Sequence, residues 1–74
     1  MNGIRDGKIL KKFGKHLAKC RKEKGLSLRK LADNSDVDFS QIHRIEKGIT
    51  NPSLTMLLAL SEGLGIPIEE LISF

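Results

Sequence analysis

The sequence is short of several residue types, and each shortage narrows what the chain can be. Cys20 is the single cysteine, so no disulfide can form within the chain and no cysteine cluster can hold a metal ion. Three Phe and no Trp or Tyr leave a core built mainly from Leu and Ile. No apolar run approaches the roughly 20 residues that span a bilayer, and no signal peptide is recognisable. We therefore expect a cytoplasmic protein that does not enter the membrane.

Residue patterns that would indicate catalysis are also missing. We find no Ser–His–Asp or Cys–His spacing, no paired histidines and no glycine-rich phosphate loop. Asp33, Asp36 and Asp38 resemble the start of an EF-hand loop, but the Gly and the final Glu of that loop are not at their offsets. We expect no enzymatic activity, no metal site and no cofactor.

The charges are distributed unevenly along the 74 residues. Residues 1–30 contain 11 Lys or Arg and two acidic residues, whereas residues 31–74 contain two basic and seven acidic residues. A domain with one basic part favours a polyanionic partner such as nucleic acid. The alternative is a solvated lysine-rich helix face.

Apolar spacing predicts a single all-α domain of five helices. Residues 1–7 are polar and predict a flexible arm, and residues 8–74 form the domain. In the first helix, residues 8–24, the residues Leu10, Phe13, Leu17 and Cys20 form one apolar stripe, and Gly14 suggests a close helix contact. The other helices are expected at residues 28–34, 38–47, 54–63 and 66–74. The fourth is apolar on most sides, as is typical of a central core helix.

Residues 26–48, LSLRKLADNSDVDFSQIHRIEKG, carry the most informative pattern. Two short helices are separated by a polar break that ends at Val37. Ser27 and Asp38 are favourable N-caps for them, and Ile42 and Ile45 place one side of the second helix in the core. This layout is a helix-turn-helix, in which the second helix is free to enter the major groove of DNA.

The motif LSxRxLAxxSxVxxxxIxxIExG, followed by NPSLxxLLxLxxxLGI, resembles the lambda-repressor-like (Xre/Cro) family of DNA-binding domains. The resemblance covers residues 8–72, which is nearly the whole chain. It implies a compact five-helix domain whose second and third helices form the helix-turn-helix. It also implies double-stranded DNA as the partner.

Positions in the family pattern imply which residues contact DNA bases. They are Phe39, Ser40, Gln41, His43 and Arg44. Arg44 can pair with guanine, Gln41 with adenine, and Phe39 can pack on a thymine methyl group. Two alternatives remain open: Gln41 can instead complete a capping box at the start of its own helix, and Phe39 can pack on the protein or on a protein partner.

A second set of residues is expected to contact the DNA backbone. The set is Ser27, Arg29, Lys30, Lys47, Thr50 and Asn51. The Ser27 hydroxyl and the neighbouring helix amides are natural phosphate ligands. The family usually has a backbone-contacting Gln where this chain has Leu28, and Arg29 and Lys30 either replace that contact or are simply solvated.

The resemblance has further structural implications. It implies an ion pair between Arg21 and Glu46, which would join the first and third helices. Many members have Gly where this chain has Asp36, because the backbone there is left-handed, and Asp tolerates that conformation better than most residues.

The apolar C-terminus suggests an interface between two copies of the chain. Ile68, Ile72 and Phe74 either form a two-fold contact or cover the domain's own core. The function that these observations favour is a dimeric repressor that binds a pseudo-palindromic operator. The alternative is an antitoxin or another protein-interaction module with weak or autoregulatory DNA binding.

Overall fold

The computed structural model describes residues 7–74 as five helices without a strand. In chain order they are α1 (Gly7–Glu23), α2 (Leu28–Ser35), α3 (Phe39–Glu46), α4 (Leu54–Leu64) and α5 (Ile68–Leu71). The predicted all-α, five-helix fold is therefore confirmed. The predicted flexible arm lies outside the described residues except for Gly7, which already belongs to α1.

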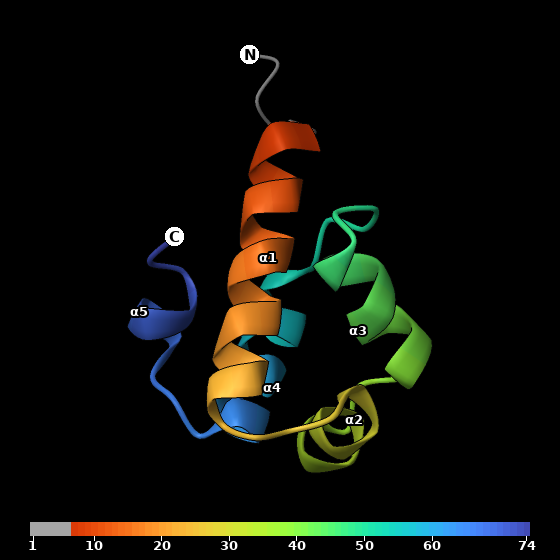
Figure 1. Ribbon diagram of the computed structural model, residues 1–74, viewed down its shortest axis with the longest axis vertical. Coiled ribbons are helices and arrows are strands. Elements are labelled where there is room, and N and C mark those ends of the chain that lie inside the picture. Colours follow the sequence, from red (N-terminus) through yellow and green to blue (C-terminus); the bar gives the residue numbers. More distant parts are fainter. Residues whose placement is uncertain (1–6) are drawn as a thin grey trace.

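The helices pack so that α2 and α3 lie together on one side of the molecule. Figure 1 shows α3 and α5 on opposite sides of the long α1 helix, with α2 near the C-terminal end of α1. α1 packs against α3, whereas α2 packs against both α4 and α3. α5 is held against α4 and α1. The two helices of the helix-turn-helix are thus packed against α1 and α4.

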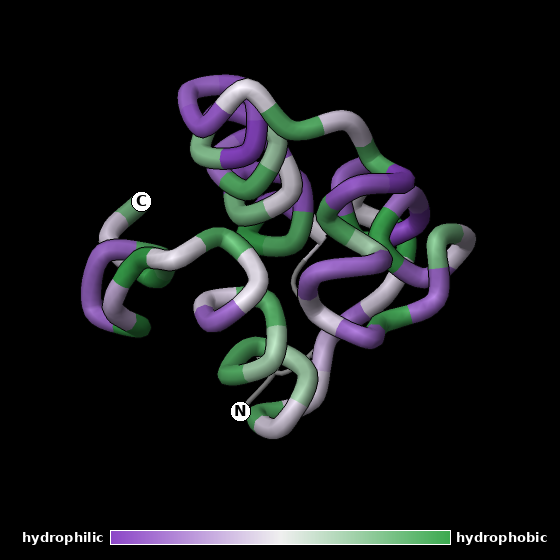
Figure 2. The backbone as a smooth tube through the Cα atoms, turned by 90° about the horizontal axis from the view of Figure 1, so that it is seen from below, coloured by the Kyte–Doolittle hydropathy of each residue, from purple (hydrophilic) through white to green (hydrophobic). Residues whose placement is uncertain are grey.

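The core is aliphatic, as the composition predicts. Its fully buried large side chains come from all five helices and are Leu17, Leu31, Ile42, Ile45, Leu60 and Leu71. Figure 2 shows the corresponding alternation of hydrophobic and hydrophilic positions along the helices. Cys20 is part of this core, and burial raises the pKa of its thiol above the ordinary value.

Gly14 brings α1 and α3 into close contact. A Cβ atom at this position would lie 2.5 Å from the carbonyl oxygens of Ile45 and Glu46. Real Cβ atoms essentially never approach so closely, so one of the two helices would have to move. The sequence prediction of a close helix contact at Gly14 is correct.

Two of the helices differ from expectation. α5 covers only Ile68–Leu71, and Pro67 at its N-cap offers no side-chain hydrogen bond to stabilise it. α4 is not buried all round, since Leu54 and Leu58 are 69% and 44% exposed. His16 in α1 is half-buried, and its Nε2 atom lies 3.0 Å from the carbonyl oxygen of Glu70.

Neither a membrane segment nor a metal cluster is seen in residues 7–74. None of the helices there combines the length and the apolar character needed to cross a bilayer. No three His, Cys, Asp or Glu side chains of this part of the chain gather where they could hold a metal ion.

Candidate DNA-binding surface

The turn between α2 and α3 has the geometry of a helix-turn-helix. α2 begins after Ser27, whose hydroxyl oxygen accepts a hydrogen bond of 3.0 Å from the backbone N–H of Lys30. It ends at Asp36, which is left-handed with φ = 57° and ψ = 30°. The chain turns there and α3 begins after Asp38. Asp36 is therefore a tolerated replacement for glycine at a position that requires a positive φ.

Inside the turn, Ser35 supplies the hydrogen bonds that the backbone needs. Its buried hydroxyl donates to the carbonyl oxygen of Leu31 at 2.6 Å and accepts from the backbone N–H of Val37 at 3.3 Å. Asn34 adds a hydrogen bond of 3.3 Å from its side-chain amide to the carbonyl oxygen of Gly63 in α4. These contacts hold the turn in place, and with it the start of α3.

α3 is divided sharply into a buried and an exposed side. Ile42 and Ile45 are 0% and 1% exposed and anchor the helix in the core. The exposed side chains include every predicted base-contacting residue, namely Phe39, Ser40, Gln41, His43 and Arg44. The structure thus brings these five exposed residues together on one helix.

The start of α3 is capped by Asp38, and this affects two of the predicted base contacts. The Asp38 carboxylate accepts hydrogen bonds from the hydroxyl and the backbone N–H of Ser40, and the former is the main reason why its pKa is below the ordinary value. The Ser40 hydroxyl is therefore engaged within the protein. The Gln41 side chain makes no hydrogen bond to residues 7–74, so the capping-box alternative for Gln41 is not observed in this part of the chain.

Contacts join both ends of the α3 surface to predicted backbone-contacting residues. At the start of α3, the guanidinium carbon of Arg29 lies 5.2 Å from the centre of the Phe39 ring. Toward its end, Nε of Arg44 donates to the hydroxyl oxygen of Thr50 at 3.4 Å. The two predicted sets of DNA contacts therefore meet in one surface that runs from α2 across α3 to the following loop.

The remaining predicted backbone contacts flank this surface. Ser27 and Lys30 are exposed at the start of α2, while Lys47 and Asn51 are exposed after α3. Because the Ser27 oxygen only accepts in its cap, its O–H group is still available as a donor to a phosphate. Leu28, which replaces the usual Gln, is half-buried and packs against the core. It is therefore a structural residue here.

Arg21 and Glu46 lie behind α3 and support it. Nε of Arg21 donates to Oε2 of Glu46 at 2.7 Å, and a second guanidinium nitrogen donates to Oε1 at 3.1 Å. A third donates to the carbonyl oxygen of Leu26 at 2.9 Å. The two side chains are only 11% and 10% exposed, so the pair is largely shielded from water. It ties the end of α3 to the end of α1.

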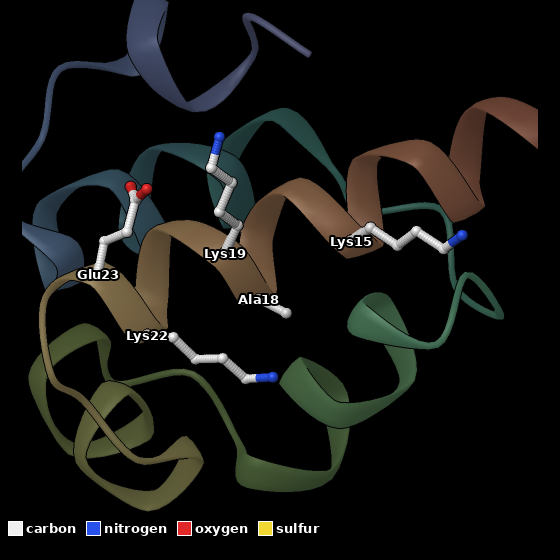
Figure 3. Close-up of a pocket in the computed structure, with 5 residues that line it drawn as sticks. All are labelled: Lys15, Ala18, Lys19, Lys22 and Glu23. Carbon is white, nitrogen blue, oxygen red and sulfur yellow. The ribbon is translucent and has the colours of Figure 1, made fainter.

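α1 contributes a basic surface that the sequence predicts from its lysine content. Figure 3 shows a shallow hollow on this helix, with Lys15 and Lys22 extending away from Lys19 and Glu23. All the residues that line it come from α1 alone. The hollow is therefore an exposed helix face that carries positive charge, and it has no enclosing second wall of the kind that a ligand pocket needs.

Sequence reasoning missed two features of the exposed side chains. The contact between Arg29 and Phe39 depends on how α2 and α3 cross, and residue spacing gives no signal for it. The exposure of Leu54 and Leu58 has a weak signal, since they lie four residues apart on one side of α4. The apolar character of the whole helix hides which side is covered.

The five-helix fold, the left-handed turn between α2 and α3, and the exposed side of α3 define a helix-turn-helix DNA-binding domain. Comparison with known proteins agrees: the sequence profile of the Helix-turn-helix family matches residues 17–71. The chain belongs to the lambda-repressor-like (Xre) family of helix-turn-helix transcriptional regulators.

Individual relatives are similar over most of the chain. It is 44% identical over 63 residues to the control protein C.MunI of Mycoplasma sp., a match that covers 84% of this chain and 85% of that protein. The crystal structure of the restriction-modification controller protein C.AhdI from Aeromonas hydrophila superposes with a TM-score of 0.81. That protein is 42% identical, and the match covers 84% of this chain and 94% of C.AhdI.

A longer regulator matches over part of its length. The transcriptional regulator SinR of Bacillus subtilis is 37% identical over 61 residues, which are 81% of this chain and 55% of SinR. The chain thus spans about half of SinR but most of the two controller proteins.

Proposed function

We propose that this protein is a dimeric transcriptional repressor that binds a pseudo-palindromic operator, with α3 in the major groove of each half-site. The observation that carries the proposal is the continuous surface on which Arg29 contacts Phe39 and Arg44 contacts Thr50. This surface offers side chains suited to base edges in its middle and groups suited to phosphates at both ends. We also propose that the protein acts in the cytoplasm, where it would meet its DNA target.

The base-contacting role rests on the exposed side of α3. The guanidinium of Arg44 can form two parallel hydrogen bonds with O6 and N7 of guanine, and Gln41 can do the same with adenine. Ser40 is engaged with Asp38, so it presents its hydroxyl oxygen mainly as an acceptor. His43 lies at the edge of the surface. Arg44 is therefore the principal candidate for specificity.

The proposed dimer contact rests on apolar side chains that stay partly exposed, although the Phe74 ring also packs edge-on against Phe13 with 5.4 Å between the ring centres. Ile72 and Phe74 are 49% and 46% exposed, and the nearby Ile9 is 47% exposed. Together with Phe13 and Leu57 they line an apolar hollow of about 160 Å³. Ile68 differs from the expectation, because it is half-buried and packs against the domain's own core. We therefore assign the contact mainly to Ile72 and Phe74.

The regulated genes are proposed from the relatives. C.AhdI is described as a restriction-modification controller and C.MunI as a control protein, and this chain matches both over most of their length. We extend that role to this protein, which would repress or otherwise control the genes of a restriction-modification system. Occupation of a promoter by a bound dimer would be sufficient for repression.

Selection of bound duplexes from a random DNA library tests the proposal. We expect a two-fold symmetric consensus whose half-sites lie about 34 Å apart, one helical turn, or a multiple of that distance. Sedimentation of the protein with the winning duplex should give two chains per duplex. Binding to any DNA with a steep salt dependence but no enriched sequence would refute the proposal and favour the protein-interaction alternative.

The dimer can be tested without DNA. Ile72→Asp should shift the free protein toward the monomer in sedimentation experiments, because it places a charge in the apolar contact. Ile49→Asp is the matched control, since Ile49 is 62% exposed but lies in the loop after α3. Equal dissociation in both variants, or in neither, would contradict the assigned contact.

A further inference from the structure

The contact between Arg29 and Phe39 is the feature of the surface that the family pattern does not explain. Arg29 lies in the first turn of α2, and Phe39 is the first residue of α3. The guanidinium carbon is 5.2 Å from the ring centre, which is within the roughly 6 Å at which a cation is attracted to an aromatic face. The attraction joins the two helices of the motif through exposed side chains.

The contact occupies only part of the Phe39 ring. The side chain remains 39% exposed, at the end of α3 where a helix in the major groove contacts bases. Arg29, Ala32, Val37 and Phe39 line a hollow between α2 and α3, together with the three acidic residues Asp33, Asp36 and Asp38. Without the cation, the ring could rotate about its side-chain bonds or fold into this hollow. The cation restricts these movements, while part of the residue stays exposed.

Phe39 has no hydrogen-bonding group, so it can distinguish bases only by apolar contact. In the major groove the apolar group that differs among bases is the C5-methyl group of thymine, which 5-methylcytosine also carries. Arg29 cannot be that contact itself, because its charge favours phosphates or guanine. The two side chains therefore have separate roles in one contact.

We propose that Arg29 is a positioning residue that holds the Phe39 ring against the C5-methyl group of one thymine in each operator half-site. The proposal rests on the proposed DNA-binding function and adds a specificity determinant to it. The pair as a unit, and not Phe39 alone, then selects a methylated pyrimidine at that position.

Replacement of thymine by deoxyuridine removes only the methyl group and tests the contact directly. Each thymine of the selected operator is replaced symmetrically, and the dissociation constant is measured for the wild-type protein. We expect one position per half-site where the loss is about fourfold, or about 15-fold for both half-sites, as for the burial of one methyl-sized group. In Phe39→Ala this loss should disappear.

The role of Arg29 is tested with charge-matched variants. Arg29→Gln and Lys30→Gln each remove one positive charge from the first turn of α2, so both should weaken binding to all DNA and reduce the salt dependence to the same extent. Only Arg29→Gln should also diminish the deoxyuridine effect, whereas Arg29→Lys should retain part of it. Melting midpoints close to wild type would show that both Gln variants fold.

Two further duplexes, which carry 5-methylcytosine or cytosine, identify the group that is recognised. At the sensitive position, 5-methylcytosine should bind more tightly than cytosine, because it restores the methyl group without the thymine O4 atom. Equal binding of these two bases, or a deoxyuridine effect that is unchanged in Arg29→Gln, would overturn the proposal. If the wild-type protein selects no operator at all, the proposed DNA-binding function is itself wrong. If it selects an operator without a methyl-sensitive position, only this inference fails.

Discussion

Removal of the Glu46 carboxylate should destabilise the domain strongly. Glu46→Ala leaves the Arg21 guanidinium largely buried, with two of its three hydrogen bonds lost. Breaking one side of a buried ion pair costs about 3–5 kcal/mol. Because Glu46 ends α3, loss of its charge also removes an unfavourable interaction with the helix dipole, which offsets about 0.5 kcal/mol. The net loss is about 2.5–4.5 kcal/mol.

That loss is large for a domain of this size. A chain of 74 residues has a free energy of unfolding of about 4–11 kcal/mol, so the variant keeps only part of its stability. Each kcal/mol lowers the melting midpoint of so small a domain by about 4–8 °C, and the midpoint should therefore fall by at least about 10 °C. Thermal unfolding followed by circular dichroism measures this shift.

Glu62→Ala is the matched control. Glu62 also lies in the last turn of its helix, but it is exposed, and its removal should change stability by no more than about 0.5 kcal/mol. The double variant Arg21→Met with Glu46→Leu should lose less than Glu46→Ala alone, because no buried charge is left unpaired. A fall of less than about 3 °C in Glu46→Ala, or one no larger than in Glu62→Ala, would show that the Arg21–Glu46 pair does not hold the domain together in this way.

Four other predictions concern single positions. Arg44→Ala should weaken operator binding by about 1–3 kcal/mol and relax specificity at one base, which a comparison with random DNA measures. Gly14→Ala should lower the melting midpoint despite the better helix propensity of Ala, because its Cβ would clash with α3. Cys20 should react slowly with an alkylating reagent near pH 8 until urea unfolds the chain, because burial raises its pKa. The pKa of Asp38, measured by NMR, should lie below the ordinary value for an aspartate and should rise in Ser40→Ala, which removes the hydroxyl that donates to the carboxylate. Because the folded-state pKa is the lower one, the stability that Asp38 contributes is present above the unfolded-state pKa and is lost as the pH falls through the folded-state pKa.

Local signals in the sequence account for most of the fold. The spacing of Ile42 and Ile45 identifies the buried side of α3, and the remaining exposed positions follow from helical geometry. Gly14 indicates a close approach because a glycine inside a helix is costly unless it permits contact. The family pattern adds the Arg21–Glu46 pair, which the structure contains. These features depend on one helix or on a recurrent motif.

Features that depend on how helices cross are not predictable in this way. The distance between Arg29 and Phe39 is set by the packing of α2 on α3, which in turn depends on the core beneath them. The exposure of Leu54 and Leu58 follows from which side of α4 receives α2, and an almost wholly apolar helix carries no clear hydrophobic direction. The extent of α5 is similarly uncertain from sequence, since a helix of four residues has little stability of its own.

The proposed function requires that the exposed side of α3 contacts base edges in the major groove. Methylation interference at guanine N7 tests it most directly, because that atom lies in the major groove and is the expected partner of Arg44. We expect at least one guanine per half-site whose methylation blocks binding of the wild-type protein, and the same methylation should have little effect on Arg44→Ala. Binding that is insensitive to every N7 methylation, and sensitive only to ethylation of phosphates, would contradict the proposed function.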